Sequence, residues 1–407
     1  MRAFELFGIC SGVFGPSSKL RLSLLNHLII IEESESPEVS RLARYCISRL
    51  EKTYENGSRM VLPSEEEIEH MKALKPYPIK IYMLSGSSII ILAESFTNAN
   101  DLKIAIISRL KIPLSKFSKF GLYEIFQDGD YQERYIEENE LIMDLVCSWA
   151  GKQGSYKILI KMRFIVETHS KDPLLPFIYM QHVFDVLRGI SKVSDKIVAA
   201  LAALKLLIDL GKGRIAEGYL ENNLNYYIPS TNIKESPETA EKLIRKAISK
   251  YNTLNEMNKS QAQVRYVEIL NKQPLIACNI FFLHFHEASG RYTLPKEIML
   301  GVNMNSLSIF SANYKRELMK FDYSQISSWG ESTDRLALFV SLNGYQVEFL
   351  FKTHQSQVIT SILKGYTSLK LNQPIDNHLS PNPKAREIGL SRALSTKFAP
   401  LPFRLFK

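Results

Sequence analysis

The sequence predicts a multidomain α+β protein whose successive regions differ in secondary structure. Three observations carry this prediction. Apolar residues recur at helical spacing over residues 1–77 and again over 172–272. Short runs of β-branched and aromatic residues, separated by turn residues, occupy 78–168 and 274–370. The chain has 407 residues, which is long enough for several separate cores.

Composition and charge narrow the class of protein. The chain is 45% hydrophobic, and no apolar run reaches the length of about 20 residues that a membrane-spanning helix needs. Its four cysteines lie far apart without a Cys-x-x-Cys pair, which argues against a disulfide framework or a zinc site and fits a reducing compartment. The net charge of +9 is thinly spread except in 371–407, which holds six basic and two acidic residues. We therefore expect no nucleic-acid partner and a flexible basic tail over 371–407.

The opening segment, MRAFELFGICSGVFGPSSKL, has the apolar character of an export signal. Glu5 interrupts the apolar run early, and no cleavage site of small residues precedes a polar start, so an export signal is not predicted. We expect a helix instead, with Phe4, Phe7 and either Ile9 or Cys10 facing neighbouring helices, and with exposed apolar surface.

The rest of the first region, 1–77, predicts further helices with recognisable boundaries. One has leucines at helical spacing after residue 17, and a second begins at Pro37 and closes at Asn56-Gly57. A third begins at Ser64, where Ser64 and Glu67 are expected to form a capping box.

The helix that begins at Pro37 also carries a basic stripe. Its basic residues are assigned to the side opposite Val39, Cys46 and Leu50, where they are either solvated or touch an acidic surface. These residues are Arg41, Arg44, Arg49 and Lys52.

The second region, 78–168, predicts a ubiquitin-like roll. A hairpin around Ser85-Gly86-Ser87 is followed by a helix over 98–110, a strand over 121–126, a turn region over 127–136 and a short helix that ends near Trp149. A last strand over 156–166 alternates between its two faces, with Phe164 on the apolar side. The basic residues of its other face are solvated or meet anionic lipid: Lys157, Lys161 and Arg163.

The remaining regions predict a helical lobe and a strand-rich lobe. Residues 172–272 contain successive runs of helical periodicity, one of which starts at Ser236-Pro237. Residues 274–370 contain seven short strand-like runs and then a helix, which is the pattern of a pleckstrin-homology-like sandwich.

Motifs for catalysis are missing from the sequence. No GxSxG nucleophile elbow and no GxxxxGK[ST] phosphate loop occurs. His284 and His286 share one face of a predicted strand, but a third metal ligand is not apparent, so no metal site is predicted. We expect no enzyme activity and no cofactor.

The order of these regions resembles a myosin tail homology 4 (MyTH4) domain that runs directly into a three-lobed FERM domain, as in the tails of certain unconventional myosins. Several stretches carry the resemblance in the right order: FGPSSKL, ARYCISRLEKTYENGSRMVLPSEEEIEHM, DPLLPFIYMQHVFDVLRG, IMLGVNMNSLSIF, FDYSQISSW and QSQVITSILKGY. A complete MyTH4 domain has further helices before this point, so the resemblance implies a truncated MyTH4 remnant.

The resemblance implies a non-enzymatic module that binds cargo or partners. Partners would be cytoplasmic tails of membrane proteins or adaptor peptides, microtubules or actin-associated proteins, with weak contact to anionic lipid. The location would be cytoplasmic, on the cytoskeleton or at the inner face of the plasma membrane. Peptides would add to a strand edge of the third lobe beside the last helix. The implied residues are Ile326, Ser327, Ser328, Trp329, Gln357, Thr360, Ser361 and Lys364.

Other proteins with this lobe order remain open on the sequence. A stand-alone FERM adaptor that joins membrane receptors to actin is one alternative. The targeting region of a larger kinase or phosphatase is another. A plant-type kinesin with the same tandem is a third.

Overall fold

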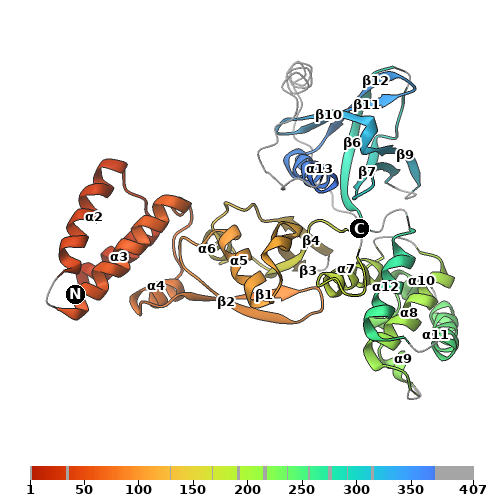
Figure 1. Ribbon diagram of the computed structural model, residues 1–407, viewed down its shortest axis with the longest axis horizontal. Coiled ribbons are helices and arrows are strands. Elements are labelled where there is room, and N and C mark those ends of the chain that lie inside the picture. Colours follow the sequence, from red (N-terminus) through yellow and green to blue (C-terminus); the bar gives the residue numbers. More distant parts are fainter. Residues whose placement is uncertain are drawn as a thin grey trace. The chain divides into compact units, whose positions relative to one another are not determined.

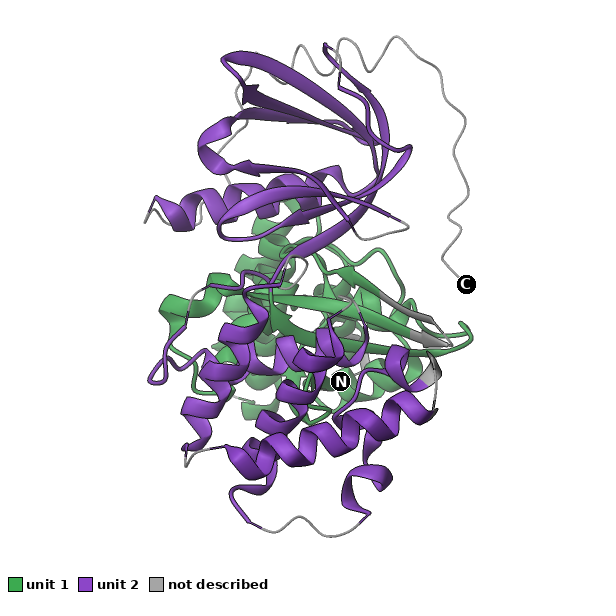
Figure 2. Cartoon of the chain, turned by 90° about the vertical axis from the view of Figure 1, so that its right-hand side faces the viewer, with its two compact units in different colours: residues 1–162 green, residues 163–407 purple. Residues whose placement is uncertain are grey.

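The computed structural model describes residues 2–33, 36–128, 130–166, 168–189, 193–213, 218–235, 237–254, 257–273, 277–290, 292–312 and 316–371. The expected basic tail lies outside the described residues, except for Leu371. The chain divides into two compact units, residues 1–162 and 163–407, which Figure 2 colours separately. No helix in the described ranges is long and apolar enough to cross a membrane.

The first unit opens with a helical region. Its helices are α1 (Arg2–Val13), α2 (Ser18–Glu32), α3 (Pro37–Asn56) and α4 (Glu65–Lys72), shown in red and orange in Figure 1. A small core joins Leu28 of α2 to Cys46 and Leu50 of α3, and the α1 side chains Phe4 and Phe7 pack against it. The predicted inward orientation of these two phenylalanines is confirmed.

The start of α4 departs from the prediction. Ser64 Oγ accepts a hydrogen bond from Glu67 N at 3.2 Å, so the N-cap is present. The Glu67 carboxylate does not return to the cap, because Arg59 holds it at 2.8 Å. The expected capping box is therefore only half formed.

A ubiquitin-like roll completes the first unit. Its strands form a five-stranded sheet in the order β2-β1-β5-β3-β4. The strands are β1 (Tyr77–Met83), β2 (Ser88–Ala93), β3 (Phe120–Asp128), β4 (Asp130–Tyr135) and β5 (Ser155–Met162). The helices are α5 (Ala99–Arg109), η1 (Leu114–Lys119) and α6 (Ile142–Cys147). The predicted hairpin and short helix are confirmed.

Two expectations about this roll are wrong. The predicted turn region over 127–136 contains β4, which pairs with β3 at the edge of the sheet. An edge strand with charged residues lacks the apolar alternation by which strands are recognised. The last strand also ends at Met162, before Phe164, so its alternation cannot be extended to that residue.

The second unit begins with the helical lobe. Its helices are α7 (Leu175–Leu187), α8 (Asp195–Leu210), α9 (Tyr219–Asn222), η2 (Leu224–Tyr226), α10 (Ser230–Glu235), α11 (Pro237–Thr253) and α12 (Lys259–Leu270). The apolar helix α8 packs against α11 and α12, and α12 also packs against α7. Ser236, proposed as a helix start, lies outside the described residues.

A histidine lies in the interior of this lobe. His182 of α7 is 0% exposed, and its Nε2 lies 3.2 Å from Asn271 Oδ1. Burial lowers the pKa of His182 to about 4, although the hydrogen bond to Asn271 opposes the shift. The imidazole is therefore neutral at pH 7.

The third lobe is a seven-stranded antiparallel sheet that is followed by one helix. The strand order is β10-β11-β12-β6-β7-β8-β9. The strands are β6 (Asn279–Ala288), β7 (Glu297–Val302), β8 (Ser306–Ser311), β9 (Glu317–Asp322), β10 (Ile326–Glu331), β11 (Arg335–Leu342) and β12 (Tyr345–Lys352). The short turn η3 (Tyr323–Gln325) leads into β10, and α13 (Ser356–Lys370) ends the lobe. The predicted pleckstrin-homology-like sandwich is confirmed.

The segment that follows β5, which contains Phe164, packs against this third lobe. Phe164 is 1% exposed and belongs to the third-lobe core, where it stands edge to face against Tyr366 of α13 at 5.1 Å between ring centroids. A Cβ at Gly365 would collide with the Phe164 ring, so the close approach requires glycine. The predicted place of Phe164 in the first-lobe sheet is thus wrong.

Candidate partner-binding surfaces

The first candidate surface lies between β10 and α13. The strand β10 stands at one end of the described sheet, and α13 packs beside it. Ile326 and Trp329 are partly buried against the third-lobe core, whereas Ser327 is exposed. Ser328 is half-buried. Trp329 therefore contributes to packing as well as to the surface.

Backbone groups of β10 face the open edge of the sheet. Ser332 N donates to Arg335 O at 2.9 Å, which makes this pair a hydrogen-bonded one. Because such pairs alternate along an antiparallel ladder, the backbone groups of Trp329 and Glu331 face away from β11. The Ile326 N–H is already used, since it donates to Tyr323 O. Ile326 is thus a poor position at which to remove an edge donor.

The predicted residues of α13 lie at different depths. Gln357 is exposed and Lys364 is half-buried, whereas Thr360 is 1% exposed and its hydroxyl contacts the Glu331 carboxylate at the end of β10. Ser361 Oγ accepts a hydrogen bond from Arg163 Nη2 at 2.8 Å. Of the four predicted residues on this helix, Gln357 and Lys364 are therefore the two that a partner can reach most easily, whereas Thr360 and Ser361 contact other parts of the chain.

The second candidate surface is the basic face of β5. Lys161 forms an ion pair with Glu133 at 2.5 Å and its Nζ lies 4.2 Å from the centroid of the Tyr123 ring. Lys157 Nζ lies 5.2 Å from the centroid of the Tyr82 ring. Arg163 is only 6% exposed, so its expected place on this face is wrong. It follows the end of β5 and turns toward α13.

The third candidate surface is the basic stripe of α3. Arg41, Arg44 and Lys52 are exposed as predicted. Arg44 pairs with Glu32 at 2.8 Å and Lys52 with Glu55 at 2.7 Å, so acidic neighbours on the same region already offset two of the three charges.

Arg49 does not belong to this stripe. It is 1% exposed, against the prediction of a solvated face. Arg49 follows Cys46 by three residues, which places it about 60° from that buried residue around the helix. The correct face was therefore available from the helical spacing.

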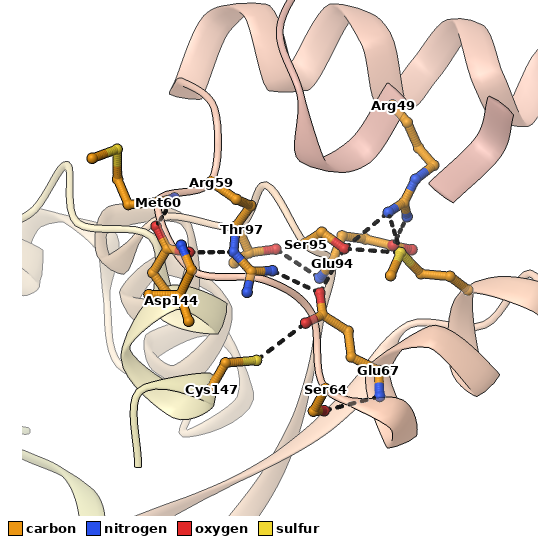
Figure 3. Close-up of polar contacts among 12 residues, drawn as sticks. Arg49, Arg59, Met60, Ser64, Glu67, Glu94, Ser95, Thr97, Asp144 and Cys147 are labelled. Atoms are coloured by element: carbon orange, nitrogen blue, oxygen red, sulfur yellow. Dashed lines mark hydrogen bonds and ion pairs between the residues drawn. The ribbon is translucent and has the colours of Figure 1, made fainter. Parts of the chain in front are cut away.

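Arg49 joins the helical region to the roll (Figure 3). Its Nη1 pairs with Glu94 Oε2 at 2.5 Å, and its Nη2 donates to Ser95 Oγ at 2.9 Å. Its Nε donates to Gly8 O in α1 at 3.1 Å. A Cβ at Gly12 would collide with the guanidinium where α1 passes over it, so a larger residue there would displace the Arg49 side chain.

A second arginine completes this junction. Arg59 Nη1 pairs with Glu67 Oε1 at 2.8 Å, and Arg59 Nε pairs with Asp144 Oδ1 at 2.5 Å. Burial by itself would lower the pKa of Arg59, but hydrogen bonds and charges from Asp144 and Glu67 outweigh burial and raise it. Both members of the Arg59–Glu67 pair have side chains at most 2% exposed.

The same carboxylates anchor the surrounding chain. Asp144 of α6 also accepts hydrogen bonds from Met60 N at 2.8 Å and Val61 N at 3.0 Å. Glu67 accepts from Ser95 Oγ at 2.7 Å and from the Cys147 thiol at 3.3 Å (Figure 3). Burial raises the pKa of Cys147, which keeps the thiol protonated as a donor. We call the contacts of Arg49 and Arg59 with these carboxylates and their neighbours the junction network. It comprises Arg49, Arg59, Glu67, Glu94, Ser95, Asp144 and Cys147. These contacts were not predicted, because they join residues that lie far apart in the chain, and only Arg49 shares the helical spacing of a buried face.

Within the ranges that the structure describes, no group of three or more histidine, cysteine, aspartate or glutamate side chains is arranged to hold a metal ion. The arrangement instead offers a strand edge beside a helix and basic patches, which are features of binding surfaces.

Family models match the chain in the order that the fold suggests. A MyTH4 domain matches residues 1–70 and an RA like domain matches 75–169. A FERM central domain matches 167–281, and a PTB domain of the IRS-1 type matches 282–371. The resemblance to a MyTH4–FERM tandem is therefore confirmed.

Two relatives match most of the chain in sequence, and a solved structure has the same fold. A kinesin-like protein of Oryza sativa subsp. japonica, KIN-14I, is 24% identical over 90% of this chain, and myosin-VIIa of Drosophila melanogaster is 22% identical over 91%. The chain spans only 31% and 17% of these two proteins. The MF1 MyTH4-FERM structure of Dictyostelium discoideum myosin VII covers 91% of this chain with 75% of its own length, at 20% identity and a TM-score of 0.73.

One similar structure contains a partner. The human myosin 7b C-terminal MyTH4-FERM domain was solved in complex with the harmonin-a PDZ3 domain. It is 18% identical, covers 91% of this chain with 75% of its own length, and has a TM-score of 0.63.

Proposed function

We propose that this chain is the partner-binding part of an unconventional, actin-based myosin tail. It is a non-enzymatic module that links a motor to membrane proteins or to cytoskeletal elements, and it acts in the cytoplasm on the cytoskeleton or at the inner face of the plasma membrane. The order of the MyTH4 and FERM matches supports this proposal, as does the similar myosin 7b module with its bound PDZ domain. The helical region 1–77 supplies a second binding surface, in addition to the one on the third lobe.

A microtubule motor is the second candidate. It is favoured by the kinesin-like relative, which is similar over 90% of this chain. Reading the full-length transcript on the 5′ side of the first codon separates the two candidates, because the motor domains of myosins and kinesins differ in sequence. A transcript with neither motor contradicts both.

Peptide binding at β10 and α13 is the proposed mechanism. The observation that carries it is the open edge of β10, where the backbone groups of Trp329 and Glu331 face outward beside α13. An extended peptide would add as a further strand and take its affinity from main-chain hydrogen bonds. Contacts of the peptide side chains with Ser327, Gln357 and Lys364 would then determine the sequence specificity. Lys157 and Arg41 would add weak attraction to anionic lipid, about 1 kcal/mol for each charge.

A displayed library of random peptides, selected against the full chain, tests this mechanism. The selected peptides are then measured against Lys364→Glu and against its matched control Lys370→Glu, which reverses the same charge at the exposed end of α13. We expect Lys364→Glu to change affinity at least about tenfold, or 1.4 kcal/mol, and Lys370→Glu to leave it unchanged. Equal affinity for all variants contradicts the assignment.

A further inference from the structure

Polar side chains of α13 border the proposed peptide site on β10. The Thr360 hydroxyl contacts the Glu331 carboxylate of β10, which shows which face of α13 is turned toward the strand. Residues four apart on a helix share one face, so Lys364 lies one turn beyond Thr360 on that face. One turn before Thr360, Ser356 Oγ donates to Ser332 O, just after the end of β10. The helix therefore runs back along β10, from the end of the strand toward its start.

Two charges of opposite sign follow one another along this face. Lys364 and Glu331 are both half-buried, and neither forms an ion pair within the described part of the chain. One helical turn advances by about 6 Å and two strand residues by about 6.6 Å. Since Thr360 meets Glu331, Lys364 lies farther along β10, in the direction of Trp329. The site is thus negative at the end of β10 and positive one turn of α13 farther on.

The pleat of β10 decides which peptide side chains meet these charges. Trp329 lies opposite Leu338 of β11. Glu331 lies opposite Leu336, and both leucines belong to the third-lobe core, which also contains the apolar face of α13. The side chains of Trp329 and Glu331 are therefore on the α13 side of the sheet. In an antiparallel strand added at the open edge, the residues directly opposite these two carry their side chains on the same side.

We propose that this site selects extended peptides with an aspartate or glutamate opposite Trp329 and a neutral or basic residue opposite Glu331. In an antiparallel strand, the residue opposite Glu331 is two positions nearer the N-terminus of the peptide. The acidic residue faces Lys364, whereas a carboxylate two positions earlier is repelled by Glu331. This selectivity rests on the peptide binding proposed above for β10 and α13, and it adds the chemistry of the partner and the register in which it binds.

A displayed library of random peptides without tryptophan, selected against the full chain, tests this selectivity. The selected peptides should share an aspartate or glutamate at one aligned position. Replacing that residue by lysine should weaken binding to wild type at least about tenfold in fluorescence anisotropy. Lys364→Glu should weaken the acidic peptide and restore binding of the lysine peptide, and Lys370→Glu should do neither. A glutamate placed two positions earlier should weaken binding to wild type, and Glu331→Gln should remove that loss.

Trp329 fluorescence in a Trp149→Phe background shows whether a selected peptide lies on β10, whatever its charge. Peptides that change this fluorescence but bind wild type equally well with glutamate or lysine at the aligned position overturn the selectivity and leave peptide binding at β10 in place. A selection that yields no peptide, or only peptides that leave Trp329 fluorescence unchanged, contradicts both proposals. The peptide substitutions are measured on wild type, so they decide the question even if Lys364→Glu fails to fold.

Discussion

The helix α13 is seated on the third-lobe sheet by apolar side chains, whereas the helical region 1–77 is joined to the ubiquitin-like roll by buried charges. Ile359, Ile362, Leu363 and Tyr366 enter the third-lobe core at 2% exposure or less. In the junction network, the side chains of Arg49 and Arg59 are also at most 2% exposed, but each forms an ion pair with a carboxylate.

Because of this difference, the two contacts should respond differently to single substitutions. Apolar packing weakens in proportion to the atoms removed and the cavity left behind. A buried ion pair contributes little net stability over an apolar replacement, yet loss of one partner strands the other charge away from water. The junction network should therefore be more sensitive to single substitutions than its net contribution to stability suggests.

The largest effect is expected from Arg59→Leu, which leaves the Glu67 carboxylate buried without its cation. We expect a loss of about 4 kcal/mol in the free energy of unfolding. The chain has two tryptophans, so Trp149 fluorescence in a Trp329→Phe background reports on the first unit during urea unfolding. Arg44→Leu breaks an exposed pair and is the control, with a loss below about 1 kcal/mol. Similar losses for the two variants would contradict the greater sensitivity expected of a buried ion pair.

Ile362→Ala tests the apolar seat of α13. Ile362 is 2% exposed, and its truncation should cost about 3 kcal/mol through lost burial and a residual cavity. Trp329 fluorescence in a Trp149→Phe background measures the effect in the second unit. Gln357→Ala on the exposed side of the same helix should change little. A loss for Ile362→Ala no larger than that control would show that the helix is not held by its apolar face.

His182 provides an intermediate case, because it is buried as a neutral group. Its pKa is about 4 in the fold and about 6.5 in an unfolded chain, so the unfolded state binds more protons between these values. The contribution of the neutral His182 to the free energy of unfolding is thus fully present above pH 6.5 and is lost as the pH falls toward 4. Between pH 7 and pH 5 this loss is about 2 kcal/mol. Urea unfolding followed by circular dichroism at the two pH values should show this loss in wild type. His182→Gln should lack that part of the pH dependence, and an unchanged dependence contradicts the assignment.

The smallest effect is expected from Ser361→Ala. This change removes one acceptor of the Arg163 guanidinium and should cost about 1 kcal/mol. Trp329 fluorescence during urea unfolding again gives the measurement, with the exposed Ser327→Ala as control. A loss above that of Ile362→Ala would mean that polar contacts, and not apolar packing, hold α13 in place.

Local pattern explains the success and the failures of sequence reasoning. Helices and strands were predicted where one face is apolar, as in α13 and β12, because periodicity is a property of neighbouring residues. The strand β4 was missed because it is polar and lies at the edge of the sheet. Arg49 was misplaced although it lies only three residues after Cys46, and Phe164 was misplaced because alternation does not say where a strand ends.

The sequence by itself determined the order of the lobes, their secondary structure, and the resemblance to a MyTH4–FERM tandem. The tertiary structure decided which charges are buried and which strand edges stay open. Arg59 meets Glu67 and Asp144, which is 85 residues away in the chain, and a contact over that separation has no local period. The open edge of β2 likewise depends on the sheet order, because β2 pairs with β1 on one side and has no strand on its other side in the described sheet.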